Sequence, residues 1–317
     1  MALHQPSGRR WLGLLLTLLT VLFWATQPVA FKIALEQVDP LTMVWVRFAA
    51  GGLAIGGWMV WRGDLGTFRG RPAAFWLLLA IAVASLLGNF VFAILGIKWT
   101  TPANSQFLFQ ASHPLVALGA ILVFKERFNR WQWLGMGAIV AGLAIFFHDG
   151  RAGSLLSGGQ HYVLGSAMVL LSALVWPGFA LAQKQLLRHL SSIQINGFVY
   201  GVLAVAFLPC AKPSVLLGLD GAHWAAVGYC ILATVTAYLA FAGAFAHWEA
   251  SRVASVCSIT PVFTVLAVAL VHHLAPSLMR PERITLLGWA GGILIVSGSA
   301  LSSLMRDRVP AGPGGAP

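Results

Sequence analysis

Apolar runs of about twenty residues, the length that a helix needs to cross the hydrocarbon core of a bilayer, recur along this chain. The sequence divides into ten of them, and the expected spans are 11–34, 41–61, 73–97, 102–124, 131–148, 161–184, 193–210, 222–246, 250–272 and 284–304. The connections between them are mostly short. Backbone polar groups in lipid have to be satisfied within a helix or a closed barrel. These runs therefore predict an all-α integral membrane protein with ten transmembrane helices.

The charge pattern agrees with a lipid environment. Only 9% of the residues are charged, whereas soluble domains carry about 25%. The net charge of +11 is spread over many short loops without a nucleic-acid motif, so we predict no nucleic-acid partner. With the N-terminus inside, 13 Lys and Arg residues fall on the cytoplasmic side and 6 on the other side. By the positive-inside rule both termini are expected to be cytoplasmic.

Two segments far apart in the chain match each other. Glu126–Gly142 reads ERFNRWQWLGMGAIVAG and Glu282–Gly298 reads ERITLLGWAGGILIVSG, with seven of seventeen columns identical. Pro114 pairs with Pro261 if the second half has a nine-residue insertion near residues 272–281. We therefore expect a cytoplasmic N-terminus 1–10, a first repeat 11–148, a linker 149–160, a second repeat 161–304 and a disordered cytoplasmic tail 305–317.

Each predicted repeat holds five helices, and because five is odd the two halves enter the membrane in opposite directions. Inverted repeats are a recurring plan of secondary transporters, with the substrate near the midplane between the repeats. The chain start, Arg9 and Arg10 before an apolar run, imitates a signal peptide. This run has a counterpart in the second half, so we expect it to be retained.

On these residues the chain resembles the drug/metabolite transporter superfamily of the EamA type. The shared features are a Trp in the first and sixth helices (Trp24 and Trp176), Arg47 in the second helix, and a Glu-Arg pair before the last helix of each half. The resemblance implies two EamA repeats of five helices, a bacterial inner (plasma) membrane and metabolite export. The second half departs from the first at the position that matches Arg47, where it has Val199.

Acidic residues are absent from the middle of every expected span. All nine lie in predicted loops or at their edges: Glu36, Asp39, Asp64, Glu126, Asp149, Asp220, Glu249, Glu282 and Asp307. This weakens a carboxylate sodium site or a carboxylate proton relay. The chain also has no HExxH, P-loop or GxSxG motif. We therefore predict that the protein is not an enzyme and has no cofactor and no metal site.

Arg47 is a cation placed well inside an expected span. A guanidinium in the membrane has to face protein or water and find a partner. One interpretation makes Arg47 a counter-charge for an anionic or carboxylate-bearing substrate. The other makes it structural, bound permanently to helix-end carbonyls or to Glu36 or Asp39.

The expected span 102–124 carries the best polar candidates. Gln106, Gln110 and His113 share one face of a helix. Pro114 cannot donate to the carbonyl of Gln110, which leaves that oxygen for a ligand or water. His113 is also a candidate for proton coupling, since histidine titrates near neutral pH. Alternatively, these groups form hydrogen bonds between helices as structural contacts.

Prolines interrupt the first and sixth spans at corresponding places, Pro28 and Pro177, and such interruptions point to a binding site. Polar and aromatic side chains nearby would give a mostly apolar pocket with a few placed polar groups. Taken with the span above, the predicted substrate-binding residues are Trp24, Gln27, Asn89, Gln106, Gln110, His113, Trp176, Tyr200 and Tyr238.

The predicted function is a secondary transporter that moves a small amphipathic metabolite, such as an amino acid, by alternating access around a central cavity. Its partners are then a small-molecule substrate and the lipid bilayer; the sequence leaves monomer and homodimer open. Two alternatives remain, a flippase for a lipid-linked substrate and a membrane scaffold or sensor that does not transport.

Overall fold

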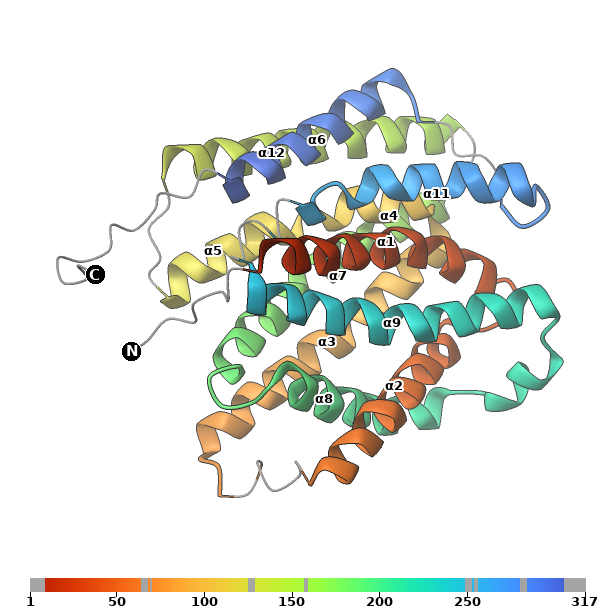
Figure 1. The fold of residues 1–317 in the computed structure, drawn as a ribbon. Coiled ribbons are helices and arrows are strands. Elements are labelled where there is room, and N and C mark those ends of the chain that lie inside the picture. The colour runs from red at the N-terminus through yellow and green to blue at the C-terminus, as the bar shows by residue number, and fades with distance from the viewer. Residues whose placement is uncertain are drawn as a thin grey trace.

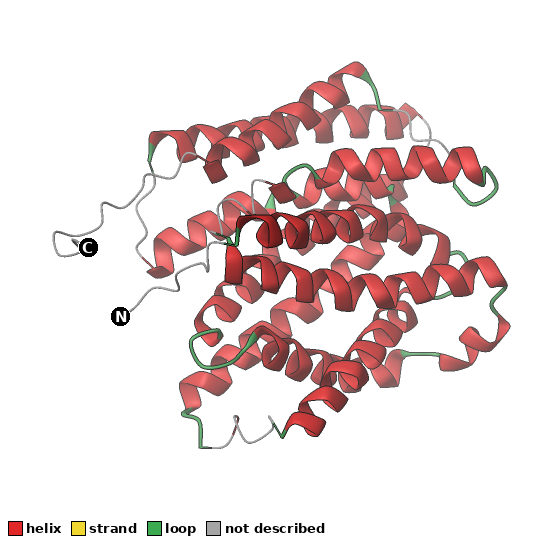
Figure 2. Ribbon diagram, viewed as in Figure 1, coloured by secondary structure: helices red, strands yellow, loops and turns green. Residues whose placement is uncertain are grey.

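The computed structural model describes residues 9–63, 68, 70–124, 129–156, 159–248, 253, 256–279 and 284–304. The regular elements within these residues are all helical (Figure 1, Figure 2). The α-helices are α1 (Arg10–Ala34), α2 (Pro40–Arg62), α3 (Ala73–Trp99), α4 (Pro102–Phe109), α5 (Ser112–Phe124), α6 (Arg130–Leu156), α7 (Gln160–Leu186), α8 (Ser192–Phe207), α9 (Gly221–His247), α11 (Thr260–Leu274) and α12 (Leu286–Leu304). Two short 3-10 helices, η2 (Leu208–Cys210) and η3 (Pro213–Gly218), follow α8.

The expected membrane protein is confirmed in its coarse form. Six of the described helical stretches are long and apolar enough to cross a membrane, and they correspond to α1, α2, α3, α7, α8 with η2, and α9. Shorter apolar helices occupy 260–274 and 286–301. The count of ten crossings stays a prediction.

Two boundaries differ from the sequence-based expectation. The span expected to run unbroken through 102–124 is divided into α4 and α5 by a turn at Gln110 and Ala111. Helix α6 continues to Leu156, into the stretch 149–160 that we expected to be a linker. A helix satisfies its own backbone hydrogen bonds, so it can extend past the apolar run that we used to place its end.

Side chains close several helix ends in ways that the sequence suggests. Asp39, Thr101, Ser191 and Asp220 each accept a hydrogen bond from a backbone N–H in the first turn of α2, α4, α8 and α9, respectively. These N-caps satisfy donors that a helix start leaves unpaired. Lys32 caps a helix C-terminus. Its Nζ donates to backbone carbonyls at the end of α3, including that of Thr100 at 2.6 Å.

The helices pack in pairs that join the two halves of the chain. Helix α1 packs along α9, α3 along α7, α2 along α8, and α6 along α12, and α4 also contacts α11 (Figure 1). In the predicted repeats α1 and α3 are the first and third helices of one half, and α7 and α9 are those of the other. A two-fold exchange of the halves would therefore turn the pair α1–α9 into the pair α7–α3.

The crossing of α6 and α12 has the same reciprocal form. A Cβ added at Gly142 would lie 2.7 Å from the carbonyl oxygen of Gly291. A Cβ added at Gly298 would lie 2.6 Å from the carbonyl oxygen of Gly135. In the sequence comparison Gly135 aligns with Gly291 and Gly142 with Gly298, so the two contacts exchange under the predicted repeat. Such reciprocity is typical of a two-fold interface, and small residues allow membrane helices to approach closely.

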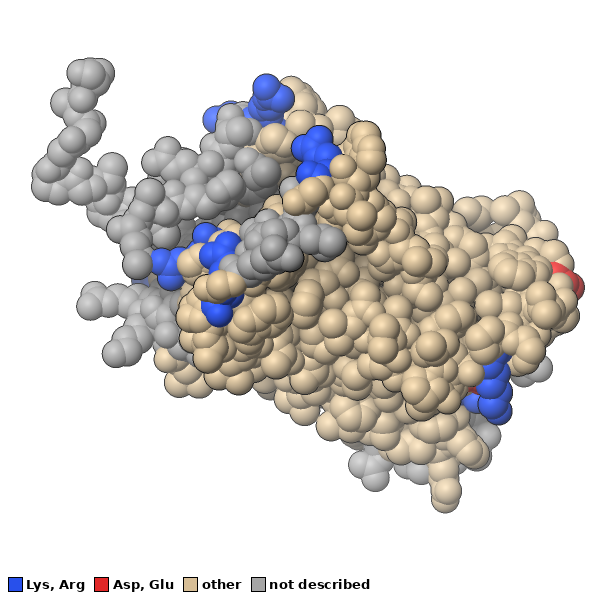
Figure 3. Space-filling view, turned by 90° about the horizontal axis from the view of Figure 1, so that it is seen from below, with Lys and Arg blue, Asp and Glu red and all other residues tan. Residues whose placement is uncertain are grey.

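Charged side chains lie toward the two ends of the molecule on the face shown in Figure 3, and the middle of that face is uncharged. This distribution suits a chain whose central belt faces hydrocarbon.

Several expected features lie outside the described residues. They include both Glu-Arg pairs (126–127 and 282–283), part of the proposed insertion (280–281), the start of the ninth expected span (250–252) and the tail 305–317.

Candidate functional site

Thr234 on α9 is the centre of a buried polar cluster between α1, α2 and α9. Its hydroxyl donates to the carbonyl of Cys230 at 2.6 Å. The same oxygen accepts from Arg47 Nε at 2.7 Å and from Gln27 Nε2 at 3.2 Å. Thr234 is fully buried. The structure thus brings together Gln27 and Arg47, two residues that the sequence singled out, through a third residue that it did not.

Arg47 is only partly satisfied by these contacts. Its side chain is 0% exposed, and Nη1 and Nη2 are buried without a hydrogen-bond partner among the described residues. The centroids of the Phe31 and Phe90 rings lie 4.5 and 4.8 Å from its Cζ, close enough for cation–π attraction. Its hydrogen-bond partner is Thr234 rather than Glu36 or Asp39, the loop acids that we considered.

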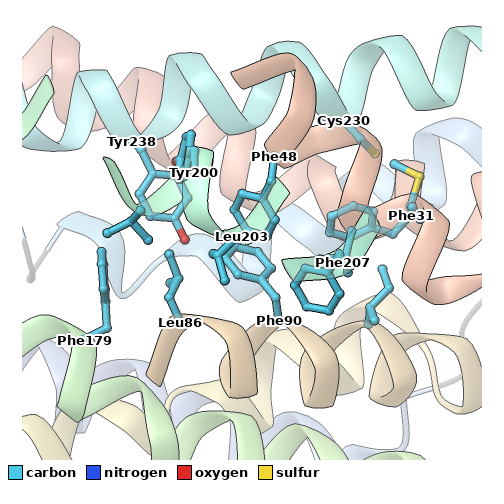
Figure 4. Close-up of a cluster of buried hydrophobic side chains, with 14 of the residues drawn as sticks. Phe31, Phe48, Leu86, Phe90, Phe179, Tyr200, Leu203, Phe207, Cys230 and Tyr238 are labelled. Carbon is cyan, nitrogen blue, oxygen red and sulfur yellow. The ribbon is translucent and has the colours of Figure 1, made fainter. Parts of the chain in front are cut away.

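A chain of aromatic contacts runs from Trp24 on α1 to Phe48 on α2. Trp24 meets Tyr238 edge-on with ring centroids 5.9 Å apart, and Tyr238 meets Tyr200 at 6.2 Å and 86°. Tyr200 lies 5.2 Å from Phe48. Figure 4 shows Tyr200 and Tyr238 together at one end of this buried group, with Phe31 and Cys230 at the other. Three of the predicted site residues therefore share one apolar interior.

Gln106 joins α4 to this group. Its Nε2 donates to the carbonyl of Trp24 at 2.8 Å. Pro28 is four residues after Trp24 and has no N–H to offer that carbonyl. The side chain of Gln106 thus takes the place of the backbone donor that the proline removes.

Gln110 links the turn after α4 to the turn before α11. It lies in the turn between α4 and α5, and its Nε2 donates to the carbonyl of Ser258 at 3.3 Å. Ser258 lies in the turn that precedes α11. Both groups are buried. Pro114 and Pro261, which align in the predicted repeats, stand near the starts of α5 and α11, the segments that follow these turns.

One expectation about this turn is wrong. The carbonyl of Gln110 is not left for a ligand, because it accepts from the backbone N–H of His113 at 3.1 Å. Nδ1 of His113 also lies 3.3 Å from it. The tighter i→i+3 bond replaces the i→i+4 bond that Pro114 cannot make.

Asn89 and Trp176 lie outside the cluster. Asn89 Nδ2 donates to the carbonyl and the hydroxyl of Ser172 at 3.0 and 3.3 Å, which ties α3 to α7. Trp176 packs against Phe109 and Phe179, with centroids 5.8 and 5.3 Å away.

Sequence reasoning missed Thr234 and Asn196. Asn196 on α8 is fully buried, and neither polar atom of its side chain has a hydrogen-bond partner among the described residues. Tyr200, one turn further along α8, has a buried hydroxyl in the same condition. A polar residue inside an apolar run was the available signal for both Thr234 and Asn196.

A cavity of about 410 Å³ lies elsewhere, along α11 and α12. Its lining is mainly apolar and includes Phe107, Ile259, Val262, Trp289 and Val296. It reaches the polar groups above only at Ser258, the acceptor for Gln110. The Arg47 guanidinium, in contrast, is enclosed by side chains.

A titratable cluster connects the loop after α1 to the start of α9, outside the membrane-spanning segments. Asp220 accepts from the backbone N–H of His223 at 2.9 Å and lies 2.8 Å from its Nδ1. Gln37 Nε2 donates to the other carboxylate oxygen at 3.0 Å. These bonds, the backbone one foremost, lower the pKa of Asp220 from 3.8 to about 2.

The lowered pKa predicts an acid-sensitive stability contribution. A carboxyl whose pKa falls on folding stabilises above its unfolded pKa, and the contribution disappears as the pH falls through the folded pKa. We expect Asp220→Asn, which keeps an N-cap, to melt below the wild type at pH 5 to 7. The gap should close between about pH 4 and pH 2. Thermal unfolding in detergent measures it, and a gap independent of pH would contradict the assignment.

The helical architecture, the apolar belt and the buried polar cluster define a multi-pass membrane protein. A solved crystal structure matches it with a TM-score of 0.62 at 19% identity, covering 91% of this chain and 95% of that one. That likeness concerns the fold alone. The model of the EamA-like transporter family matches residues 11–148 and again 163–304. The chain therefore belongs to the EamA-like transporter family of the drug/metabolite transporter superfamily. Membership of this family indicates a transporter rather than an enzyme.

Relatives carry transporter names. An uncharacterized inner membrane transporter of Escherichia coli K12, YhbE, is 31% identical over 95% of this chain and 93% of its own length. An uncharacterized transporter of Haemophilus influenzae is 27% identical over 94% and 97%. A probable amino-acid metabolite efflux pump of Escherichia coli K12 is 23% identical over 89% and 92%.

Proposed function

We propose that the protein is a secondary transporter that carries a small amphipathic metabolite, an amino acid or a related compound, by alternating access between two inverted five-helix repeats. Efflux or exchange is the expected mode. The amino-acid class is suggested by the name of the 23% identical relative. By the same reasoning from relatives, the proposed location is the inner membrane, with both termini on the cytoplasmic side.

The hydrogen bond between the turn after α4 and the turn before α11 is the observation that carries this proposal. Interrupted segments at corresponding places in two halves are a feature of transporter binding sites. The turn after α4 and the turn before α11 hold such places, and the Gln110–Ser258 hydrogen bond joins them. Polar contacts also tie α4 to α1 through Gln106, and α1 and α2 to α9 through Thr234. We infer that these turns act as a joint about which one repeat moves against the other.

Exchange flux in proteoliposomes tests the proposal. The panel consists of labelled amino acids, nucleobases, sugars and polyamines, each with and without a pH gradient. We expect saturable flux of one class, and we expect Gln110→Leu to lower it by about tenfold or more. The physical reason is that the substitution removes the buried hydrogen bond that joins the two turns, and removing one partner of a buried hydrogen bond costs roughly 1–3 kcal/mol.

Gln160→Leu is the matched control, because Gln160 is exposed at the start of α7; its flux should equal that of the wild type. Absence of flux across the panel, from protein shown to be folded, would contradict transport and favour a non-transporting scaffold. The pH gradient tests proton coupling, for which His113 remains the proposed group. Flux that ignores the gradient would argue against that role.

The cavity along α11 and α12 bears on the flippase alternative. A lipid-linked substrate has a polar headgroup that needs polar lining during its passage. The lining of this cavity is mainly apolar, with Ser258 and Ser297 among its few polar members. This cavity by itself therefore offers few groups that could bind such a headgroup.

A further inference from the structure

We propose that the free edge of the Arg47 guanidinium is a carboxylate-binding site, closed in this structure and opened during the transport cycle. The proposal rests on the proposed transport function and adds to it the chemical group by which the substrate is recognised. It assigns that role to Nη1 and Nη2, the two nitrogens at the end of the side chain.

The first argument is that the charge of Arg47 is not compensated. A buried cation is costly unless it is paired and hydrogen-bonded. Arg47 is 0% exposed, and its hydrogen bond within the described residues goes to a neutral hydroxyl, that of Thr234. The chain's nine acidic residues all fall outside the expected spans. A permanent structural role would call for a counter-charge or for acceptors on all three nitrogens, and the described residues provide neither.

The second argument concerns geometry. A guanidinium can hold a carboxylate by two parallel hydrogen bonds, which adds specificity as well as energy. Arg47 Nε already donates to the Thr234 hydroxyl. The pair of donors that includes Nε is therefore not available to a carboxylate. Phe31 and Phe90 contact the guanidinium through their rings. The edge formed by Nη1 and Nη2 is left for an incoming group, which would bind end-on.

The third argument comes from another unpaired group in the side-chain layer that surrounds Arg47. The Phe48 ring centroid lies 6.0 Å from Arg47 Cζ and 5.2 Å from the Tyr200 ring centroid. The Tyr200 hydroxyl is buried and without a hydrogen-bond partner among the described residues. Buried polar groups are nearly always hydrogen-bonded, so the unpaired groups of Arg47 and Tyr200 are most simply parts of a binding site in its closed state. The surrounding rings suit a substrate that carries its carboxylate on an apolar body.

Ligand-induced thermal stabilisation of the purified full chain tests the proposal. The probes are L-amino acids and simple monocarboxylates, each compared with its methyl ester and with the analogue that lacks the carboxyl group. We expect at least one acid to raise the melting temperature. Its ester should bind at least about tenfold more weakly, because hydrogen bonds between charged groups are the strong ones. Chloride and inorganic phosphate, tested alone, should give no comparable shift.

Arg47→Lys keeps the charge but removes the planar guanidinium that can form two parallel hydrogen bonds. The preference for acid over ester should therefore fall by about tenfold or more. Arg62→Lys is the matched control, since Arg62 ends the same helix and lies over the Trp58 ring; its preference should be unchanged. If Arg47→Lys fails to fold, the comparison of acid with ester in the wild type still decides.

Four outcomes would overturn the assignment: stabilisation by ester equal to that by acid, an equal shift with chloride or phosphate, a preference kept in folded Arg47→Lys, or no shift with any acid. Flux measurements separate this failure from that of transport. Flux of a sugar or an amine without carboxylate recognition would remove the Arg47 site and leave the transporter. Acid binding without any flux would support the Arg47 site and contradict the transport function.

Discussion

Replacing Gly142 by leucine should prevent the normal packing of α6 on α12. Even a Cβ at this position would lie 2.7 Å from the carbonyl oxygen of Gly291, a backbone atom that cannot turn aside. The helices would have to separate, with loss of the contacts on both sides of the crossing. We expect a cost of about 3 kcal/mol or more, at the upper end of what overpacking costs. The readouts are the yield of monodisperse protein and its melting temperature in detergent.

Gly137→Leu is the matched control for this prediction. Gly137 is on the same helix, is exposed, and has nothing within 4 Å of an added Cβ. Because glycine is a poor helix former, this variant should be as stable as the wild type or slightly more stable. Gly298→Leu should repeat the loss caused by Gly142→Leu, since its added Cβ meets the Gly135 carbonyl oxygen at 2.6 Å. Equal stability of the Gly142 and Gly137 variants would refute the close crossing.

Replacing Thr234 by valine should leave the buried cluster of α1, α2 and α9 without its common acceptor. Valine has nearly the same shape, so the change removes a hydroxyl and little packing. Arg47 Nε would lose its hydrogen bond, and Gln27 would keep only its weaker contact with the Cys230 carbonyl at 3.4 Å. A buried charged donor without a partner is costly, and we expect the variant to lose roughly 2–4 kcal/mol of unfolding free energy. Thermal and denaturant unfolding in detergent measure the loss.

A control variant and a double-mutant cycle with Arg47 test this prediction further. Thr236→Val changes a neighbouring, partly exposed residue of α9 and should alter stability by less than about 0.5 kcal/mol. In an Arg47→Met background the cost of Thr234→Val should shrink, because the charged donor is gone. Such non-additivity is what contacting residues show in a double-mutant cycle. Additive losses would mean that the Arg47–Thr234 bond contributes nothing to stability.

The sequence alone predicted a membrane protein and its family. The first depends on local composition and the second on repeated motifs. Apolar runs long enough to span hydrocarbon determined where most of the helices lie, and α1, α2 and α3 fall on three of the expected spans. The family followed from residues such as Trp24, Arg47 and the repeated glycine-rich segment. The break of the span 102–124 at Gln110 and Ala111 was not predicted, although the sequence shows that Pro114 cannot donate a hydrogen bond to the Gln110 carbonyl.

Tertiary structure decided which polar groups meet. The periodicity of a helix indicates that Gln106 and Gln110 share a face, but it cannot show that one binds the Trp24 carbonyl and the other the Ser258 carbonyl. Asn89 looked like the other candidates in sequence, yet its partner is Ser172 on α7. Contacts between residues far apart in the chain depend on how helices cross, and local sequence does not encode that. Thr234, which no motif marked, holds Arg47 and Gln27 because α9 packs between α1 and α2.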